Sequence, residues 1–191
     1  PDTMDRRRSI IRDNVARNDR VENNTLRGGG LNIGGGTILI TGTTISGNSV
    51  SGGVGDSEMN GGGIDGLTGG AGRITLVNST VSGNSAEGSG GGIWVDEDFH
   101  LELRNTTVFG NFGVDGGGLR LTSGSVVTLT NSVVAGNVDT GSNNRDDCFG
   151  SIDIVSFGHV QNTTGCVFGS GAPTTGASGL AALANNGGTT V

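Results

Sequence analysis

The chain has 191 residues and a formal net charge of −7, and 40 of its residues are glycine whereas only 2 are proline. Residues 1–27 carry seven arginines against five acidic residues, but the rest of the chain is acidic, and an acidic surface repels phosphate backbones, so we expect no nucleic-acid partner. No stretch approaches the roughly 20 consecutive apolar residues of a membrane-spanning helix, so we expect no transmembrane segment. No secretion signal is recognisable and the chain begins at Pro1, so we expect a processed or partial segment of a longer protein.

The first 27 residues predict a partial N-terminal coil of a repeat protein. They contain one weak copy, Ile11–Asn14, of a motif that recurs more strongly later. Arg6 stands at a slot that later copies fill with leucine or isoleucine, which suggests a charged cap on this end of the stack.

Residues 28–147 contain four strong copies of one repeat. Each copy opens with three glycines and a leucine or isoleucine, continues through a β-rich run, and closes with an aliphatic residue three positions before an asparagine. The triplets begin at Gly28, Gly61, Gly90 and Gly116, and the asparagines are Asn48, Asn84, Asn111 and Asn137. Counted from Asn14, successive asparagines are 34, 36, 27 and 26 residues apart, which predicts coils of about 26–36 residues with loops inserted at 52–60 and at 65–72.

Aligned on their asparagines, the copies share three aliphatic slots, of which the first two are separated by the two-residue period of a strand. The slots hold Ile38, Ile74, Leu101 and Val127; then Ile40, Leu76, Leu103 and Leu129; then Ile45, Val81, Val108 and Val134. A single coil cannot bury such a face, whereas stacked coils share one core. The sequence therefore predicts an all-β, single-domain, right-handed parallel β-helix.

The repeated asparagines predict a structural ladder through the stack. Asparagine adopts left-handed turns, and its amide can bond to the coil above or below. We therefore expect Asn48, Asn84, Asn111 and Asn137, with Asn14 before them, to be structural, and a row of ligand-binding amides is the alternative. The sequons at Asn23, Asn78, Asn105 and Asn162 reflect the same repeat composition better than they indicate glycosylation.

Residues 148–191 predict a C-terminal coil and tail closed by a disulfide. Cys148 and Cys166 are the only two cysteines, and a local bridge between them fits an oxidising compartment, with free buried thiols as the alternative. The run 170–190 is small, polar and uncharged, which is a poor cap for a strand edge. Bare ends would let identical subunits stack into a fibre.

These residues resemble two bacterial families. The paired signatures, a glycine triplet followed by isoleucine or leucine and an aliphatic or aromatic residue shortly before the asparagine, are similar to repeats of chlamydial polymorphic outer-membrane proteins. The run Asn131–Asn137, the cysteine-bearing loop after it, and the stretch Leu183–Gly188 more closely resemble proteins with the "choice-of-anchor Q" domain, over roughly residues 9–191. The chain lacks the proline that usually follows Asn-Gly-Gly in that family. The resemblance implies secretion, a surface or extracellular role, and no agreed catalytic residues.

Acidic clusters are the candidates for chemistry. Glycoside hydrolysis needs two carboxylates across one cleft, and lyases use a base with Ca²⁺ held by clustered carboxylates. Asp96, Glu97 and Asp98 share one turn, and Asp146 and Asp147 another, but neither cluster recurs at the same slot of an adjacent coil. We expect solvated turns, with a weak calcium site as the alternative, and we predict neither a catalytic residue nor a bound cofactor.

The pattern as a whole favours an extracellular or cell-surface protein with a structural or adhesive role. End-to-end association into a homo-oligomer or filament is its specific form, and surface glycans are possible partners. The alternative is a carbohydrate-binding or carbohydrate-active β-helix, of the polysaccharide lyase or hydrolase kind.

Overall fold

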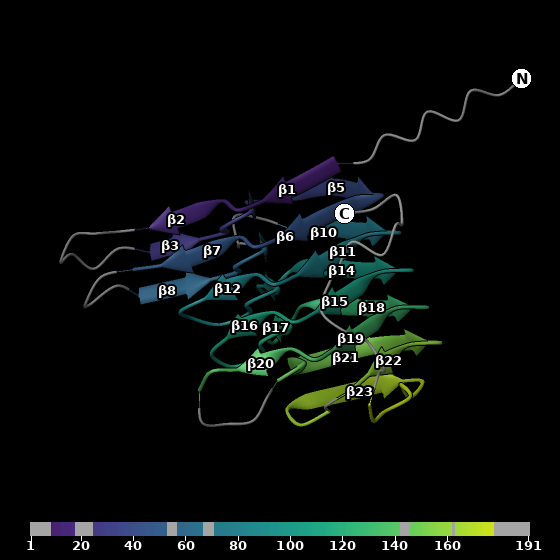
Figure 1. Cartoon of the computed structure of the whole chain (residues 1–191). Coiled ribbons are helices and arrows are strands. Elements are labelled where there is room, and N and C mark those ends of the chain that lie inside the picture. The colour runs from purple at the N-terminus through teal and green to yellow at the C-terminus, as the bar shows by residue number, and fades with distance from the viewer. Residues whose placement is uncertain are drawn as a thin grey trace, which may run out of the picture.

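The computed structural model describes residues 9–17, 25–52, 57–66, 71–141, 146–161 and 163–177. All regular structure in these ranges is β-strand, and every strand pairs in parallel with the strand at the same slot of a neighbouring repeat (Figure 1). The all-β class and the parallel pairing predicted from the repeat are thus confirmed. The strands form ladders that run the length of the stack.

One ladder of six strands follows the third aliphatic slot. It contains β1 (Ser9–Arg12), β6 (Thr43–Ser46), β11 (Thr80–Ser82), β15 (Thr107–Phe109), β19 (Val133–Ala135) and β22 (His159–Val160). A ladder of five short strands follows the asparagines. It contains β2 (Val15–Arg17), β7 (Ser49–Ser51), β12 (Ser85–Ala86), β16 (Phe112–Gly113) and β20 (Val138–Asp139).

The largest sheet combines two ladders that meet at its last strand. The strands after the glycine triplets are β4 (Leu31–Ile33), β9 (Ile64–Gly66), β13 (Ile93–Val95) and β17 (Leu119–Leu121). The strands holding the first two aliphatic slots are β5 (Gly36–Thr41), β10 (Gly72–Val77), β14 (Phe99–Arg104) and β18 (Val126–Thr130). The long strand β21 (Cys148–Ser156) pairs with both β17 and β18, and β23 (Cys166–Ser170) pairs with β21.

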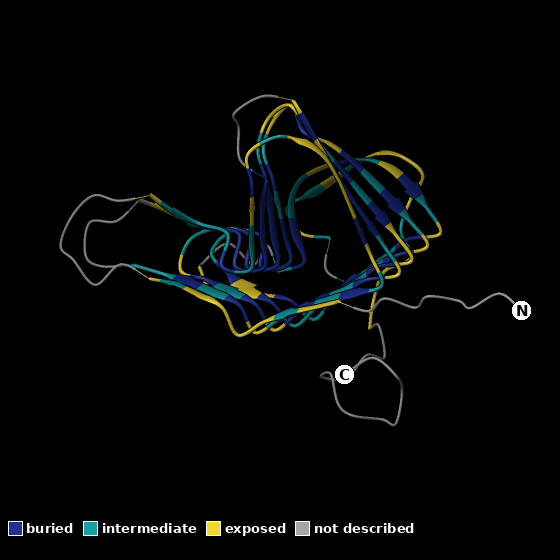
Figure 2. Cartoon of the chain, turned by 90° about the horizontal axis from the view of Figure 1, so that it is seen from above, coloured by how far each residue is buried: buried dark blue, intermediate teal, exposed yellow. Residues whose placement is uncertain are grey.

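The three aliphatic slots form the core in the predicted register. Ile74 pairs with Ile38 on one side and Leu101 on the other, and the second and third slots align in the same way. From the second strong copy onward these side chains are almost completely buried. Seen from above (Figure 2), the sheets curl around this buried interior, and Figure 1 shows β2 and β7 toward one side of the stack.

The insertion expected as a loop at 52–60 is partly a strand, which corrects the prediction. β8 (Ser57–Asn60) pairs in parallel with β3 (Thr25–Arg27) of the preceding repeat. Two successive long repeats therefore supply each other with a partner, and an extended segment with a partner forms a strand rather than a loop. The second insertion, 65–72, includes the end of β9 and the start of β10, and its residues 67–70 lie outside the described ranges.

Candidate functional site

A buried ladder of amide side chains runs through the stack. The Nδ2 of Asn14 donates to Oδ1 of Asn48 at 2.8 Å, and the same bond joins Asn48 to Asn84, Asn84 to Asn111 and Asn111 to Asn137 at 2.9, 3.0 and 2.8 Å. Each receiving oxygen, from Asn48 to Asn137, also accepts the backbone N–H of the preceding asparagine. The amides thus bond to one another, and all the bonds point the same way along the stack.

The ladder ends on a carboxylate instead of a sixth asparagine. Oδ1 of Asp147 accepts both the backbone N–H and the Nδ2 of Asn137, at 3.1 and 2.8 Å. Asp147 stands at the position that the third glycine of the triplet has in the other repeats. The backbone N–H of Leu119 donates to the Asp147 carbonyl, and one repeat earlier the backbone N–H of Ile93 donates to the Gly118 carbonyl in the same way. In the inner repeats a Cβ at this slot would meet the asparagine of the same coil, as at Gly118, where Asn137 Nδ2 would lie 2.7 Å away.

A second, exposed asparagine ladder lies at a corner of the stack. The Nδ2 of Asn131 donates to Asn105 Oδ1 at 2.7 Å, and Asn105 donates to Asn78 at 3.1 Å. All three have positive φ, as do the residues at the two ends of this column, Gly42 and Phe157. From the sequence alone, Asn78 and Asn105 were recognised only as sequons. Their constant distance of six residues before the buried asparagines was the signal for a second column. The sequons at Asn23 and Asn162 lie outside the described residues.

The carboxylates of Asp96 and Asp146 accept hydrogen bonds from the protein itself. Asp96 Oδ1 accepts from Thr122 Oγ1 at 3.2 Å, Asp98 sits in a turn with positive φ, and Asp146 Oδ1 accepts the backbone N–H of Asp139 at 2.9 Å. Asp147 belongs to the buried ladder. Within the part of the chain that the structure describes, no three His, Cys, Asp or Glu side chains gather where they could hold a metal ion.

An ionic cluster between β3, β8 and β9 was missed by sequence reasoning. Arg27 pairs with Glu58, lies 3.9 Å from Asp65, and stacks 4.6 Å from the ring centre of Trp94. The Asp65 side chain is fully buried, and burial raises the pKa of its carboxyl to about 7, an effect that Arg27 partly opposes. The cluster anchors the projecting strands β3 and β8 to the stack. Its sequence signal was a single charged or aromatic residue between two core positions, as in Ile64–Gly66 and Ile93–Val95.

Two of the surface grooves combine apolar side chains with a position near an end of the described stack. The first, of about 590 Å³, is bordered by the turn between β17 and β18 and by β21, and it contains Phe149, Asp153 and Arg120, whose guanidinium lies 4.2 Å from the Phe149 ring centre. The second, of about 530 Å³, is the open end of the core at the N-terminal strands, and it is lined mainly by isoleucine and leucine. We call this second one the N-terminal groove.

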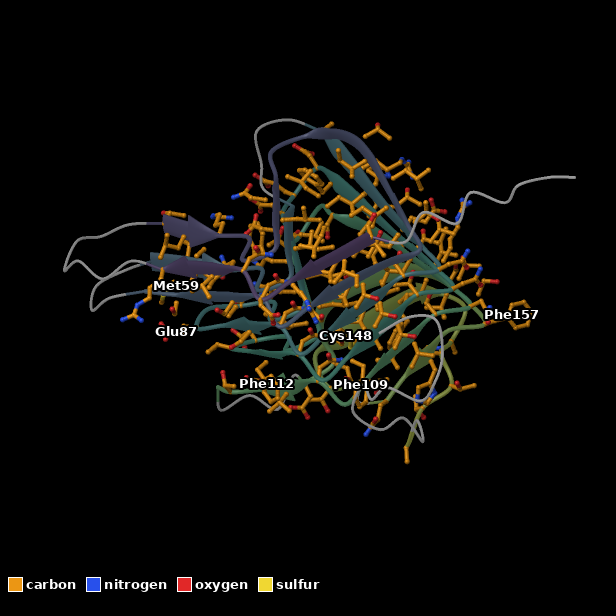
Figure 3. The ribbon with its side chains drawn as sticks, turned by 45° about the horizontal axis from the view of Figure 1, so that its top comes forward. Met59, Glu87, Phe109, Phe112, Cys148 and Phe157 are labelled. Carbon is orange, nitrogen blue, oxygen red and sulfur yellow. A yellow bond between two sulfur atoms is a disulfide. The ribbon has the colours of Figure 1, made fainter. Side chains whose placement is uncertain are left out.

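A disulfide joins Cys148 at the start of β21 to Cys166 at the start of β23, with their Cα atoms 5.5 Å apart. Cys148 is buried in the core and is labelled in Figure 3. The bridge therefore ties the last strand of the sheet to the stack. No helix that could cross a membrane occurs among the residues described.

Comparison with known proteins leaves the family of the chain open. No family model matches it, and neither a curated protein nor a solved structure was found to be similar.

Proposed function

We propose that the chain is a right-handed parallel β-helix that serves as an extracellular structural or adhesive segment. The main support for this proposal is the continuous hydrogen-bond ladder from Asn14 to Asp147. In this ladder the recurring polar side chains bond one repeat to the next. A stack of this kind offers length, stiffness and repeated surface. The Cys148–Cys166 disulfide supports an oxidising, extracellular location.

An adhesion assay tests this proposal. Beads coated with the purified chain should be retained under flow on cell surfaces or matrix proteins, or the chain should assemble with itself. As a control, beads coated with chain that has been unfolded by reduction and alkylation in denaturant should not be retained. Absence of both adhesion and self-association would refute the structural or adhesive role. Release of new reducing ends or unsaturated products from a panel of polysaccharides would instead establish the carbohydrate-active alternative.

Carbohydrate binding is the second candidate, and the groove around Phe149 favours it. Sugar sites commonly combine an aromatic ring with charged hydrogen-bonding groups, and Phe149, Arg120 and Asp153 provide both in one groove. On a glycan array, Phe149→Ala should abolish any binding that this groove provides, whereas Phe112→Ala, at a partly exposed ring in β16, should leave it unchanged. Equal binding by both variants would exclude the groove.

A further inference from the structure

The exposed asparagine ladder ends one coil before its corner column does. Each asparagine of this ladder donates its Nδ2 to the Oδ1 of the preceding repeat, and the last such bond runs from Asn131 to Asn105 at 2.7 Å. The next residue of the column is Phe157, because Thr130 pairs with Ser156 directly before it. Phenylalanine carries no amide, and among the described residues no group donates to Asn131 Oδ1. The ladder therefore ends on an acceptor for which the described part of the chain supplies no donor.

Phe157 is an unusual residue for this corner. Its φ of 54° is close to the 46° of Asn131, in a left-handed region that asparagine and glycine adopt readily and bulky residues rarely do. The ring is 90% exposed, and Figure 3 shows it directed away from the body of the protein. Phe157 thus strains the backbone while it buries almost no apolar surface. Strained residues of this kind cluster at binding and active sites.

A groove of about 370 Å³ lies beside the end of this ladder. Residues 131–133 and 157–159 line it, together with Ala172 and Thr174. Thr174 is fixed in place, because its backbone N–H donates to the Gly158 carbonyl at 3.0 Å and its Oγ1 lies 2.9 Å from His159 Nδ1. The volume falls within the roughly 300–1,000 Å³ of small-molecule sites. No lining residue is shared with the groove around Phe149 or with the N-terminal groove.

The lining of this groove favours an uncharged ligand. Its described residues provide amide, hydroxyl, imidazole, aromatic and aliphatic groups, but no aspartate, glutamate, arginine or lysine. A charged ligand would lose its hydration here without gaining a counter-charge. A neutral ligand that combines an apolar face with an N–H donor would instead match both the Phe157 ring and the Asn131 oxygen.

We propose that this groove binds a sugar that carries an acetamido group, as N-acetylglucosamine and N-acetylgalactosamine do. The acetamido N–H donates to Asn131 Oδ1, as Asn131 Nδ2 itself donates to Asn105 one repeat earlier. The ligand thus supplies the amide that Phe157 lacks, and it continues the ladder by one step. The apolar face of the sugar ring packs against the Phe157 ring, where both surfaces leave water.

This inference deepens the adhesive role proposed above, and as an explanation of adhesion it rests on that role. The site differs from the groove around Phe149, so different variants test the two binding hypotheses. The proposals also fail separately. Self-assembly, or adhesion to surfaces that lack acetamido sugars, would support the structural or adhesive role even if no sugar bound beside Phe157.

The first experiment determines the ligand class by NMR titration of the full chain. N-acetylglucosamine and N-acetylgalactosamine are compared with glucose, galactose and glucosamine, which have the same ring type without the acetamido group. At least one acetylated sugar should bind about tenfold more tightly than its parent sugar, the effect of one added hydrogen bond to a fixed acceptor. Its binding should shift the side-chain amide signal of Asn131. Equal binding of the parent sugars, or no binding of either acetylated sugar, would overturn the proposal.

The second experiment repeats the titration with variants of the ring. Phe157→Asn places the protein's own amide in the slot, so it should abolish binding and also raise the thermal midpoint, which excludes misfolding as the cause. Phe157→Gly introduces the residue that the first coil has at this corner, Gly42, and should weaken binding by about tenfold because the ring is lost. Phe149→Ala, in the other groove, is the matched control and should bind like the wild type. Undiminished binding by Phe157→Asn, or an equal loss in Phe149→Ala, would exclude the site.

Discussion

Replacing Asn84 by alanine should destabilise the protein more than any single exposed substitution in the stack. The Asn84 side chain is fully buried and makes four hydrogen bonds. Its Nδ2 donates to the Ile45 carbonyl and to Asn111 Oδ1, both at 3.0 Å. Its Oδ1 accepts the backbone N–H and the Nδ2 of Asn48, at 3.0 and 2.9 Å.

The magnitude follows from the groups that lose a partner. Alanine leaves two donors of Asn48 without this acceptor and removes a donor from the Ile45 carbonyl, while Asn111 Oδ1 keeps the backbone N–H of residue 84. A buried polar group left without a partner costs about 1–3 kcal/mol, so for these three groups we expect a loss of about 3–9 kcal/mol in the free energy of unfolding. This is a large share of the total stability of an ordinary domain.

Urea unfolding followed by circular dichroism measures this loss, with Asn105→Gly as the matched control. Asn105 belongs to the exposed ladder and has positive φ, which glycine adopts without strain, so the control should change stability by less than about 1 kcal/mol. If Asn84→Ala cost no more than Asn105→Gly, the buried amides would not stabilise the stack, and the reasoning from unsatisfied groups would be wrong.

Three further predictions concern other parts of the stack. The pKa of Asp65 is about 7 in the folded protein and near 3.8 in the unfolded chain, so the free energy of unfolding should fall by roughly 2–4 kcal/mol as the pH rises through this interval. In urea titrations at several pH values, Asp65→Asn should remove most of this dependence. An unchanged pH dependence in the variant would refute the assignment to Asp65. Gly63→Ala should lower the free energy of unfolding by about 3 kcal/mol or more, because the new Cβ would lie 2.6 Å from a backbone oxygen. Gly34→Ala, where a Cβ would have nothing within 4 Å, should leave stability unchanged. Equal thermal unfolding midpoints for the two variants would contradict the close contact at Gly63. Reducing the Cys148–Cys166 disulfide, which links residues 18 positions apart, should lower the free energy of unfolding by about 3 kcal/mol and speed hydrogen exchange in β23. Unchanged hydrogen exchange in β23 would show that the disulfide is not needed to hold this strand.

The core residues and their register could be predicted from the sequence because the same aliphatic positions recur in every repeat. Ile38, Ile74, Leu101 and Val127 align by counting back from the asparagines, and the structure pairs them in this register. The partner of β8 could not be found in this way, since β3 and β8 occur only in the two long repeats and share no motif.

The ion pair of Arg27 with Asp65 was also beyond sequence reasoning. The two residues are 38 positions apart, and their pairing does not recur, because the Asp65 position holds Trp94 and Arg120 in the next two repeats and the Arg27 position holds Ser89 and Asp115. No periodicity therefore marks the pair. The end of the buried ladder at Asp147 was hidden for a different reason. Counting along the repeat looks for the next asparagine after Asn137, whereas the ladder is completed by a residue at a glycine slot.

The carboxylate at the end of the ladder has a consequence for how the protein can change length. Each inner repeat receives the amide protons of the repeat before it and passes its own to the next, so a duplicated repeat placed between Asn84 and Asn137 would find both of its partners in place. A repeat added after Asp147 would meet a carboxylate that can only accept, and it would begin a separate ladder. Duplication of an inner repeat can therefore lengthen the buried ladder from within, while the end of the ladder stays fixed by one aspartate.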